Sequence, residues 1–370
     1  MKTAVLFIGN LLLCYSLAAQ MYKDPSLSVE KRVADLMGRM TLDEKIAQLG
    51  MRDAELYKTD PNGFGVCECP KIGVGDVLKS SYETKKYARE NTRLGIPPIM
   101  SAECLHGLLA YGATIFPQAL AQGSAWNPDL IEQMAQMIAE ESSAAGVDQA
   151  LSPLFDLARE PRYGRMEECY SEDACLTGEM GAVFVRGMQG DPAETRYRLS
   201  DNKVICTAKH FVGYSSPIAG INVAPAAIGL RELRSLHLPP FEKAVKDANV
   251  YSVMPSYNEI DGIPAHASNF LLNHVLRDEW GFQGYVFADY SAVWRLFALH
   301  KVAETVADAG KKAIMAGVDL EASRAYAYTH LKSLVEQNRL DMKYIDQACK
   351  RILTVKFKAG LFDKPYPDIS

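Results

Sequence analysis

Short apolar runs alternate with amphipathic stretches along the chain from Leu94 onward. The apolar runs have the length of buried strands, and they predict strands at residues 98–102, 149–153, 204–208, 251–255, 285–288 and 318–320. Between them, apolar residues recur with a helical period, which predicts helices at residues 127–143, 229–248, 269–280 and 304–316. The first of these helices has Asn127 at its N-cap and Pro128 at its first helical position.

Strands separated by helices indicate a parallel sheet covered by helices. A TIM-type barrel takes about 250 residues, and the number of units favours a (β/α)8 barrel, with an open doubly wound sheet as the alternative. The chain carries neither a GxGxxG segment after a first strand nor a Walker motif. Nucleotide binding therefore lacks its usual sequence support.

The N-terminal part of the chain follows a different pattern. Residues 29–49 have a helical period, and Thr41 with Glu44 forms a capping box that restarts the helix after Met40. Residues 52–77 are rich in Gly, Pro and charged residues, which predicts a loop.

Composition places the chain among globular proteins with a large core. It has 370 residues, of which 48% are hydrophobic, and a formal net charge of -5. The absence of a basic excess argues against a nucleic-acid partner.

Residues 1–19 have the build of a secretory signal peptide. Lys2 precedes an apolar stretch over residues 4–13, and small residues end at Ala19. A buried N-terminal helix is the alternative. A lipoprotein site requires a small residue directly before the modified Cys, and Leu13 before Cys14 is not small, which argues against lipidation. No later run reaches the roughly 18 to 20 apolar residues of a membrane span, so we expect a periplasmic or secreted protein with no membrane contact after signal removal.

Cysteines and histidines do not form a metal-binding pattern. Removal of residues 1–19 leaves an odd set of cysteines scattered along the chain: Cys67, Cys69, Cys104, Cys169, Cys175, Cys206 and Cys349. This is not a disulfide framework, although an oxidising compartment permits one or two bridges. No Cys or His pairs have zinc spacing, and no HExxH occurs. We expect neither metal nor cofactor.

Polar residues gather directly after the predicted strands. Asp289 closes the apolar run 285–288, at the carboxyl end of a strand, where barrels keep their catalytic residues. An N-cap or structural acid is the alternative for Asp289 alone. The other strands lead into Glu103 with His106, Asp156 with the segment that holds Arg165, Lys209 with His210, and Tyr257 with Asn258. Each has an ordinary structural alternative, but together they suit a small ligand dense in hydroxyl groups, such as a sugar.

These segments resemble the barrel domain of glycoside hydrolase family 3. The similarity follows the family order in SAECLHG, ATIFPQALAQGSAWNPDLI, LSPLFDLAREPRYGRMEECYSED, AKHFVGYS, LRSLHLPPFEKAV, SVMPSYNEIDGIP, LLNHVLRDEWGFQGYVFADY and AGVDLE. It runs from about residue 29 to residue 362 and is strongest to the bacterial β-xylosidase and β-glucosidase branch. The resemblance implies a barrel domain over residues 20–362, with residues 363–370 as the start of an interdomain linker.

The resemblance also implies roles for individual residues. Asp289 would attack the anomeric carbon of a glycoside or oligosaccharide and form a covalent glycosyl-enzyme, in a retaining mechanism. Glu168 would orient Arg165 or Lys209 from behind. The residues that would hold or line the first sugar subsite are Glu103, Arg165, Lys209, His210, Met254 and Tyr257.

Three features depart from the family pattern. Tyr290 stands where many members have Trp after the nucleophile. The segment after His210 lacks the paired Asp and His of the members that release N-acetylglucosamine. Retaining enzymes also need an acid/base carboxyl roughly 5 to 5.5 Å from the nucleophile, which two-domain members usually supply from an α/β-sandwich domain. We expect that domain to be absent, and an acid/base to come, if at all, from a missing C-terminal domain or a partner.

The leading hypothesis is an exo-β-glycosidase that hydrolyses terminal non-reducing β-D-xylosyl or β-D-glucosyl residues, impaired by the missing acid/base. The alternative is a catalytically inactive or fragmentary sugar-binding barrel. A metal-dependent barrel hydrolase is disfavoured by the absence of ligand spacing. Xylose and glucose differ by one CH₂OH group, which one or two side chains can distinguish.

Overall fold

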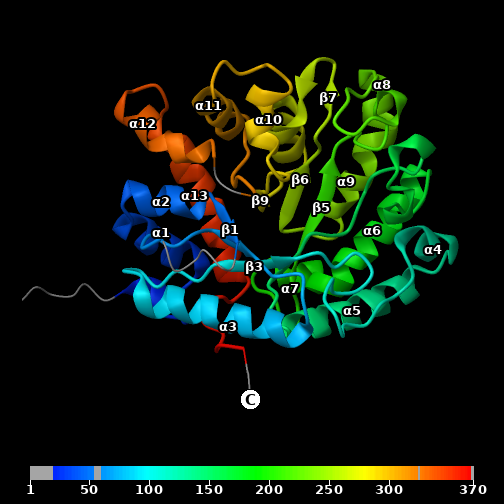
Figure 1. Cartoon of the computed structure of the whole chain (residues 1–370). Helices are drawn as coiled ribbons and strands as arrows, with labels where there is room; N and C mark the ends of the chain where they lie inside the picture. Colours follow the sequence, from blue (N-terminus) through cyan, green and yellow to red (C-terminus); the bar gives the residue numbers. More distant parts are fainter. Residues whose placement is uncertain (1–19, 54–59, 324–325, 368–370) are drawn as a thin grey trace, which may run out of the picture.

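The computed structural model describes residues 20–53, 60–323 and 326–367 (Figure 1). The predicted signal peptide at residues 1–19 lies outside the described residues. None of the described helices is long and apolar enough to cross a membrane.

A curled parallel sheet forms the centre of the molecule. Its strands follow the order β1-β2-β3-β4-β5-β6-β9, and every neighbouring pair is parallel. The strands are β1 (Met51–Asp53), β2 (Val66–Glu68), β3 (Ile99–Ala102), β4 (Gln149–Ala150), β5 (Ile205–Phe211), β6 (Ser252–Pro255) and β9 (Tyr285–Val286). A separate antiparallel hairpin consists of β7 (Glu259–Ile260) and β8 (Ile263–Pro264).

The segment 318–321 closes the sheet into a barrel. Leu320 forms a parallel bridge to Phe287 on one side, and Glu321 forms a parallel bridge to Gly50 on the other. The N–H of Met51 donates to the carbonyl oxygen of Glu321 at 3.2 Å, so this segment links β9 to β1. The ring excludes the open doubly wound sheet and agrees with the predicted (β/α)8 type. The eighth position is held by bridges rather than by a full strand.

Helices surround the strands on the outside of the barrel (Figure 1). The longer ones are α1 (Val29–Arg39), α3 (Val74–Asn91), α5 (Pro128–Ala144), α6 (Ala174–Gln189), α9 (Leu238–Lys246), α11 (Val306–Ala316) and α13 (Met342–Lys358). The shorter ones are α2 (Leu42–Gln48), α4 (Ala119–Ser124), α7 (Pro192–Thr195), α8 (Leu230–Glu232), α10 (Ala292–Ala298) and α12 (Leu331–Glu336). Two segments have the wider π-helical turn, Leu233–His237 and Phe270–Glu279.

Most of the predicted helices are confirmed. α5 begins at Pro128, and the side chain of Asn127 accepts from the N–H of Leu130. The capping box between Thr41 and Glu44 is present, and it separates α1 from α2 because Met40 adopts an extended conformation. The predicted helix at 229–248 is continuous through α8, the π-helical turn and α9.

The predicted loop at residues 52–77 is wrong in part. It contains the end of β1, all of β2 and the start of α3. The two strands are only three residues long and include Arg52, Asp53 and Glu68, so they lack the continuous apolar run that marks the later strands. Pairing with neighbouring strands, rather than local composition, makes them strands.

The predicted strand at 149–153 is too long. Only Gln149 and Ala150 pair as β4, and the next contact with β5 is an isolated bridge from Leu154 to Lys209. Pro153 has no N–H to donate, which limits regular pairing at this position. The remaining predicted strands agree with β3, β5, β6 and β9 to within a few residues.

A chain of polar contacts crosses the barrel interior. The hydroxyl of Tyr285 donates to Oε1 of Gln149 at 2.5 Å, and Nε2 of Gln149 donates to Oγ1 of Thr207 at 2.8 Å. All three residues are fully buried. The first bond joins β9 to β4, which are not neighbours in the sheet, and the second joins the neighbouring strands β4 and β5, so together they stabilise the shape of the ring.

Candidate active site

Asp289 lies just beyond β9, and its carboxyl group is buried. Oδ1 accepts the backbone N–H of Tyr290 at 2.7 Å, whereas Oδ2 has no hydrogen-bond partner among the described residues. Burial raises the pKa of Asp289, while the nearby hydroxyl of Tyr257, the hydrogen bond from the N–H of Tyr290 and the charges of Lys209 and Arg165 act in the opposite direction. The result is a carboxyl group with one oxygen fixed and one available.

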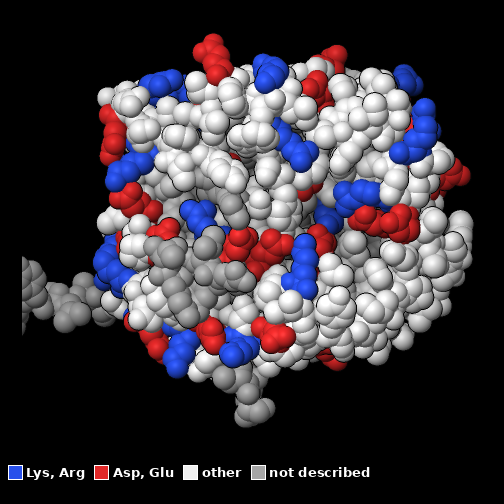
Figure 2. Space-filling view, in the orientation of Figure 1, with Lys and Arg blue, Asp and Glu red and all other residues white. Residues whose placement is uncertain are grey.

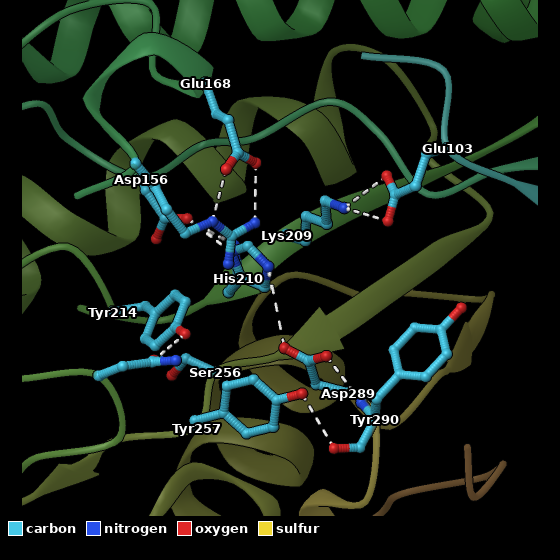
Figure 3. Close-up of polar contacts among 12 residues, drawn as sticks. Glu103, Asp156, Glu168, Lys209, His210, Tyr214, Ser256, Tyr257, Asp289 and Tyr290 are labelled. Carbon is cyan, nitrogen blue, oxygen red and sulfur yellow. Dashed lines mark hydrogen bonds and ion pairs between the residues drawn. The ribbon is translucent and has the colours of Figure 1, made fainter. Parts of the chain in front are cut away.

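Lys209 and His210 are adjacent on β5, yet both point into the site (Figure 3). A regular strand would send them to opposite faces, but the pairing of β5 with β6 shifts register between Lys209 and Phe211. Nζ of Lys209 donates to both carboxylate oxygens of Glu103, at 3.1 and 2.9 Å. Glu103 follows β3, so this ion pair spans two strand ends.

His210 lies between two carboxyl groups (Figure 3). Its Nδ1 is 2.7 Å from Oδ2 of Asp156, and its Nε2 is 3.8 Å from Oδ2 of Asp289. Burial lowers the pKa of His210 well below its ordinary value. Burial also raises the pKa of Asp156, to about 7.

Arg165 forms a two-pronged ion pair with Glu168. Its Nε and one terminal nitrogen donate to the two oxygens of Glu168 at 2.6 and 2.7 Å. The guanidinium also lies over the ring of Tyr214, 5.6 Å from its centre. Burial alone would lower the pKa of Arg165, but the hydrogen bonds to Glu168 hold it above its ordinary value. Of the two residues predicted as partners of Glu168, the structure places Arg165 against it, while Lys209 is held by Glu103.

Tyr257 and Met254 come from the end of β6. The hydroxyl of Tyr257 donates to the carbonyl oxygen of Tyr290 at 2.9 Å, and its ring covers the guanidinium of Arg295 at 4.3 Å. Met254 is part of the hydrophobic core and pairs in register with Lys209. Tyr257 is therefore close enough to Asp289 to affect the pKa of that carboxyl group, and Met254 lies in the hydrophobic core.

The predicted residues thus come together at one end of the barrel. Figure 2 shows acidic and basic side chains close together near the middle of the face that it presents. The ring of Tyr290 points away from the carboxylate of Asp289 (Figure 3). No group of three or more His, Cys, Asp or Glu side chains suited to a metal ion occurs within the described ranges.

Sequence reasoning missed three residues that contact the predicted set. Asp156 was recognised at a strand end but given no role, and it proves to bind His210. His266 carried no signal in the sequence, because it acts on the backbone of Asp289 from a short 3-10 turn at Ala265–Ala267. Tyr214, which stacks edge-on against His210 with ring centres 4.8 Å apart, was also not identified.

Chemically, this arrangement offers charged donors and acceptors around a free carboxylate oxygen. Hydrogen bonds to ionised groups are shorter and stronger than those between neutral groups. Glu103, Lys209 and Arg165 are each fixed by a partner, so they hold their orientation without a bound molecule. The site is suited to a ligand with several hydroxyl groups and an electrophilic carbon.

Comparison with known proteins gives similar proteins across nearly the whole chain. A β-xylosidase from Formosa agariphila is 40% identical over 358 residues, covering 93% of this chain and 44% of that protein. The periplasmic β-glucosidase of Salmonella typhimurium is 31% identical over 368 residues, covering 95% of this chain and 45% of that protein. A solved β-glucosidase from Erythrobacter marinus has a TM-score of 0.90 at 40% identity, covering 95% of this chain and 48% of its own.

The chain therefore spans about half the length of the curated relatives it matches. The profile described as the Glycosyl hydrolase family 3 N terminal domain matches residues 41–355, which include all eight positions of the barrel ring. With the barrel, the strand-end residues and these similarities together, the chain belongs to glycosyl hydrolase family 3.

Proposed function

We propose that this chain carries the nucleophile and the sugar subsite of a retaining exo-β-glycosidase. The observation that carries this proposal is the carboxylate of Asp289, whose Oδ2 has no hydrogen-bond partner among the described residues while Oδ1 is held by the N–H of Tyr290. Oδ2 attacks the anomeric carbon as the bond from that carbon to the aglycone oxygen breaks and the aglycone leaves. Water then hydrolyses the covalent glycosyl-enzyme and releases the sugar and the free carboxylate. An oxygen without a donor keeps its electron density for that attack.

The surrounding ion pairs bind the sugar. Glu103 accepts hydroxyl protons, while Lys209 and Arg165 donate to hydroxyl oxygens. Nε2 of His210 faces the same space as Oδ2 of Asp289. Hydrogen bonds that tighten as oxocarbenium charge develops lower the barrier by several kcal/mol. Their fixed partners limit the reorganisation that accompanies reaction.

The substrate that we propose is a terminal non-reducing β-D-xylosyl or β-D-glucosyl residue. This rests on relatives named β-xylosidase and β-glucosidase, which match the same stretch of chain. The two sugars differ by one CH₂OH group, and discrimination of that size comes from one or two side chains.

The general acid is the part of the mechanism that these residues do not supply. The described carboxyl groups gathered around Asp289 already have partners: Glu103 binds Lys209, Glu168 binds Arg165, and Asp156 binds His210. We therefore propose that the acid comes from a further domain or a partner. Glycosides with leaving groups that need no protonation will then react best, because general acid catalysis is typically worth about 10² to 10⁴-fold.

The test is the intact mass of the protein after incubation with activated 2-deoxy-2-fluoro β-glucoside and, separately, β-xyloside. These reagents need a nucleophile and a sugar subsite but little acid assistance. One adduct on the parent chain and none on Asp289→Ala supports the proposal, and the faster reagent identifies the sugar. Asp261→Asn is the matched control, because Asp261 is exposed on the β7–β8 turn.

Absence of an adduct with both reagents overturns the catalytic role of Asp289 in this chain. The second candidate, a sugar-binding barrel without catalysis, would then be supported by retained binding of glucose or xylose. Equal hydrolysis of disaccharides and nitrophenyl glycosides by the 370-residue chain would contradict the proposed external acid.

We also propose that the protein is exported to the periplasm or secreted. Lys2, the apolar stretch 4–13 and the small residues up to Ala19 support this. The N-terminal mass of the mature protein tests it, since cleavage after Ala19 leaves Gln20 as the first residue.

A further inference from the structure

Asp156 is the most completely enclosed acid around the candidate site. Its side chain is 0% exposed, and its Oδ2 contacts His210 twice: it accepts the backbone N–H at 3.2 Å and lies 2.7 Å from Nδ1. Oδ1 of Asp156 has no partner among the described residues. The catalytic step proposed above makes no direct use of this buried carboxyl.

We propose that Asp156 is a positioning residue that keeps the proton of His210 on Nδ1, and so leaves Nε2, the nitrogen that faces Asp289, without a proton. A neutral imidazole carries one proton, and the hydrogen bond made by one ring nitrogen decides which nitrogen holds it. The carboxylate accepts, so Nδ1 must donate. This inference rests on the proposed role of Asp289 as the nucleophile.

The position of the proton matters because Nε2 of His210 is close to the attacking oxygen. The two atoms are 3.8 Å apart, slightly beyond hydrogen-bond distance. If Nε2 carried a proton, a small movement would let it donate to Oδ2 of Asp289. That bond would draw electron density from the oxygen that attacks the sugar. Asp156 prevents this and leaves the lone pair of Nε2 for a sugar hydroxyl.

The surroundings keep His210 neutral rather than doubly protonated. Its ring is buried, and cationic Arg165 and Lys209 disfavour a further positive charge. The other charged or titratable groups that face the Asp156–His210 pair come from neighbouring elements: Glu168, Tyr163, Cys169, Tyr214, His266 and Asp289.

At low pH the imidazole proton of His210 should move from Nδ1 to Nε2. A proton that enters Asp156 is better held on Oδ2 than on Oδ1, because Oδ1 has no partner while Oδ2 faces Nδ1. Oδ2–H then donates to Nδ1, and the single imidazole proton moves to Nε2. Nε2–H would donate to Asp289, so the proposed attack slows as the pH falls.

Two substitutions separate positioning from simple packing. Asp156→Asn can place its carbonyl oxygen at the Oδ2 position, where it accepts both N–H groups of His210, and it cannot titrate. Asp156→Leu keeps the branched shape of the side chain with larger terminal groups, and it has no acceptor. We expect Asp156→Asn to keep the Nδ1–H form at all pH values, and Asp156→Leu to lose it.

The first measurement is the ¹⁵N spectrum of histidine-labelled protein, with the His210 signals identified by their loss in His210→Gln. The parent chain and Asp156→Asn should show a protonated Nδ1 and an unprotonated Nε2 at pH 8. Below pH 7 the parent should gain a proton on Nε2, and Asp156→Asn should not. A protonated Nε2 in the parent at pH 8 overturns the proposal.

The second measurement is the pH profile of the rate of labelling by the fluoro-glycoside. Asp156→Leu should react about 100-fold more slowly than the parent at pH 8, because the loss of one electrostatic contact in an active site typically lowers the rate by about that factor. Asp156→Asn should react within a few-fold of the parent and lose less rate in acid. Equal rates for Asp156→Leu and the parent would overturn the proposal.

If the parent forms no adduct, the proposed function fails, and the spectra still decide the proton position. If Asp156→Leu does not fold, the parent and Asp156→Asn decide it.

Discussion

The backbone N–H of Asp289 donates to Nε2 of His266, 3.1 Å away. The other ring nitrogen, Nδ1, is 3.1 Å from the carbonyl oxygen of Ser256, so it carries the ring proton. His266 therefore joins the backbone beyond β6 to the backbone beyond β9, and it fixes the peptide from which the carboxylate of Asp289 extends. Burial lowers the pKa of His266 to about 3, so the imidazole is neutral and able to accept.

Replacing His266 tests whether this backbone contact orients Asp289. In His266→Leu the N–H of Asp289 loses its acceptor in a buried position, which costs about 1–3 kcal/mol. We expect labelling by the fluoro-glycosides to slow by about 10-fold or more, with the same fold as judged by circular dichroism. His266→Gln offers both a donor and an acceptor and should restore most of the rate. Unchanged labelling of the Leu variant would show that the contact is dispensable.

His266 should also make the stability of the protein depend on pH. Its pKa is about 6.5 in the unfolded chain and about 3 in the folded one, so between these values only the unfolded state binds the proton. The stabilisation is complete above the unfolded pKa and is lost as the pH falls, by up to about 1.4 kcal/mol per pH unit. Urea unfolding of the parent and His266→Gln at pH 7 and pH 5 measures this. From pH 7 to pH 5 the free energy of unfolding of the parent should fall by more than that of His266→Gln. An equal fall in both proteins would contradict the prediction.

The ion pair between Arg165 and Glu168 gives a third prediction. In Glu168→Gln the guanidinium keeps one neutral acceptor in place of a two-pronged carboxylate, and hydrogen bonds to charged groups are worth about 1.5–3 kcal/mol. We expect sugar binding to weaken by roughly 10-fold or more, measured by calorimetry with glucose or xylose. Glu167→Gln is the control, because Glu167 is exposed beside it. Equal affinity in both variants would mean that Arg165 does not need Glu168.

The end of the barrel that holds the candidate site could be predicted, because several of the strands that lead to it are short apolar runs in the sequence. The run 285–288 is apolar, buried and followed by Asp289, and the runs before Glu103 and Lys209 have the same form. Parallel strands bring such residues to one end of a barrel whatever the loops between them do. The pairing of Lys209 with Glu103, 106 residues away, follows from that geometry but is not specified by either segment alone.

The remaining features depend on contacts that a single segment does not encode. β1 and β2 are three residues each and are strands only because they pair with their neighbours. His266 acts through a backbone N–H that is 23 residues away. Asp156 resembles any acid at a strand end until His210 is placed against it. In each case tertiary packing supplies the information, and local propensity does not.

The buried side chain of Lys356 gives the last prediction. Lys356 on α13 is 0% exposed, and its Nζ donates to Oε1 of Gln48 at 2.6 Å and to the carbonyl oxygen of Phe64 at 3.3 Å. Burial lowers the pKa of Lys356 to about 7. In the unfolded chain the pKa is about 10.4, so between these values the unfolded state binds more protons and the folded state gains stability as the pH rises.

Lys356→Met should remove this dependence. Methionine fills a similar space and does not titrate, but Oε1 of Gln48 and the carbonyl oxygen of Phe64 lose this donor. The stability of the parent relative to the variant should rise by up to about 1.4 kcal/mol per pH unit from pH 7 toward pH 10. Chemical unfolding at pH 7, 8 and 9 measures the difference. Lys350→Met is the control, since Lys350 is exposed on the same helix. If both variants follow the parent in parallel across this range, Lys356 is charged in the folded protein, and the hydrogen bonds to Gln48 and Phe64 outweigh its burial.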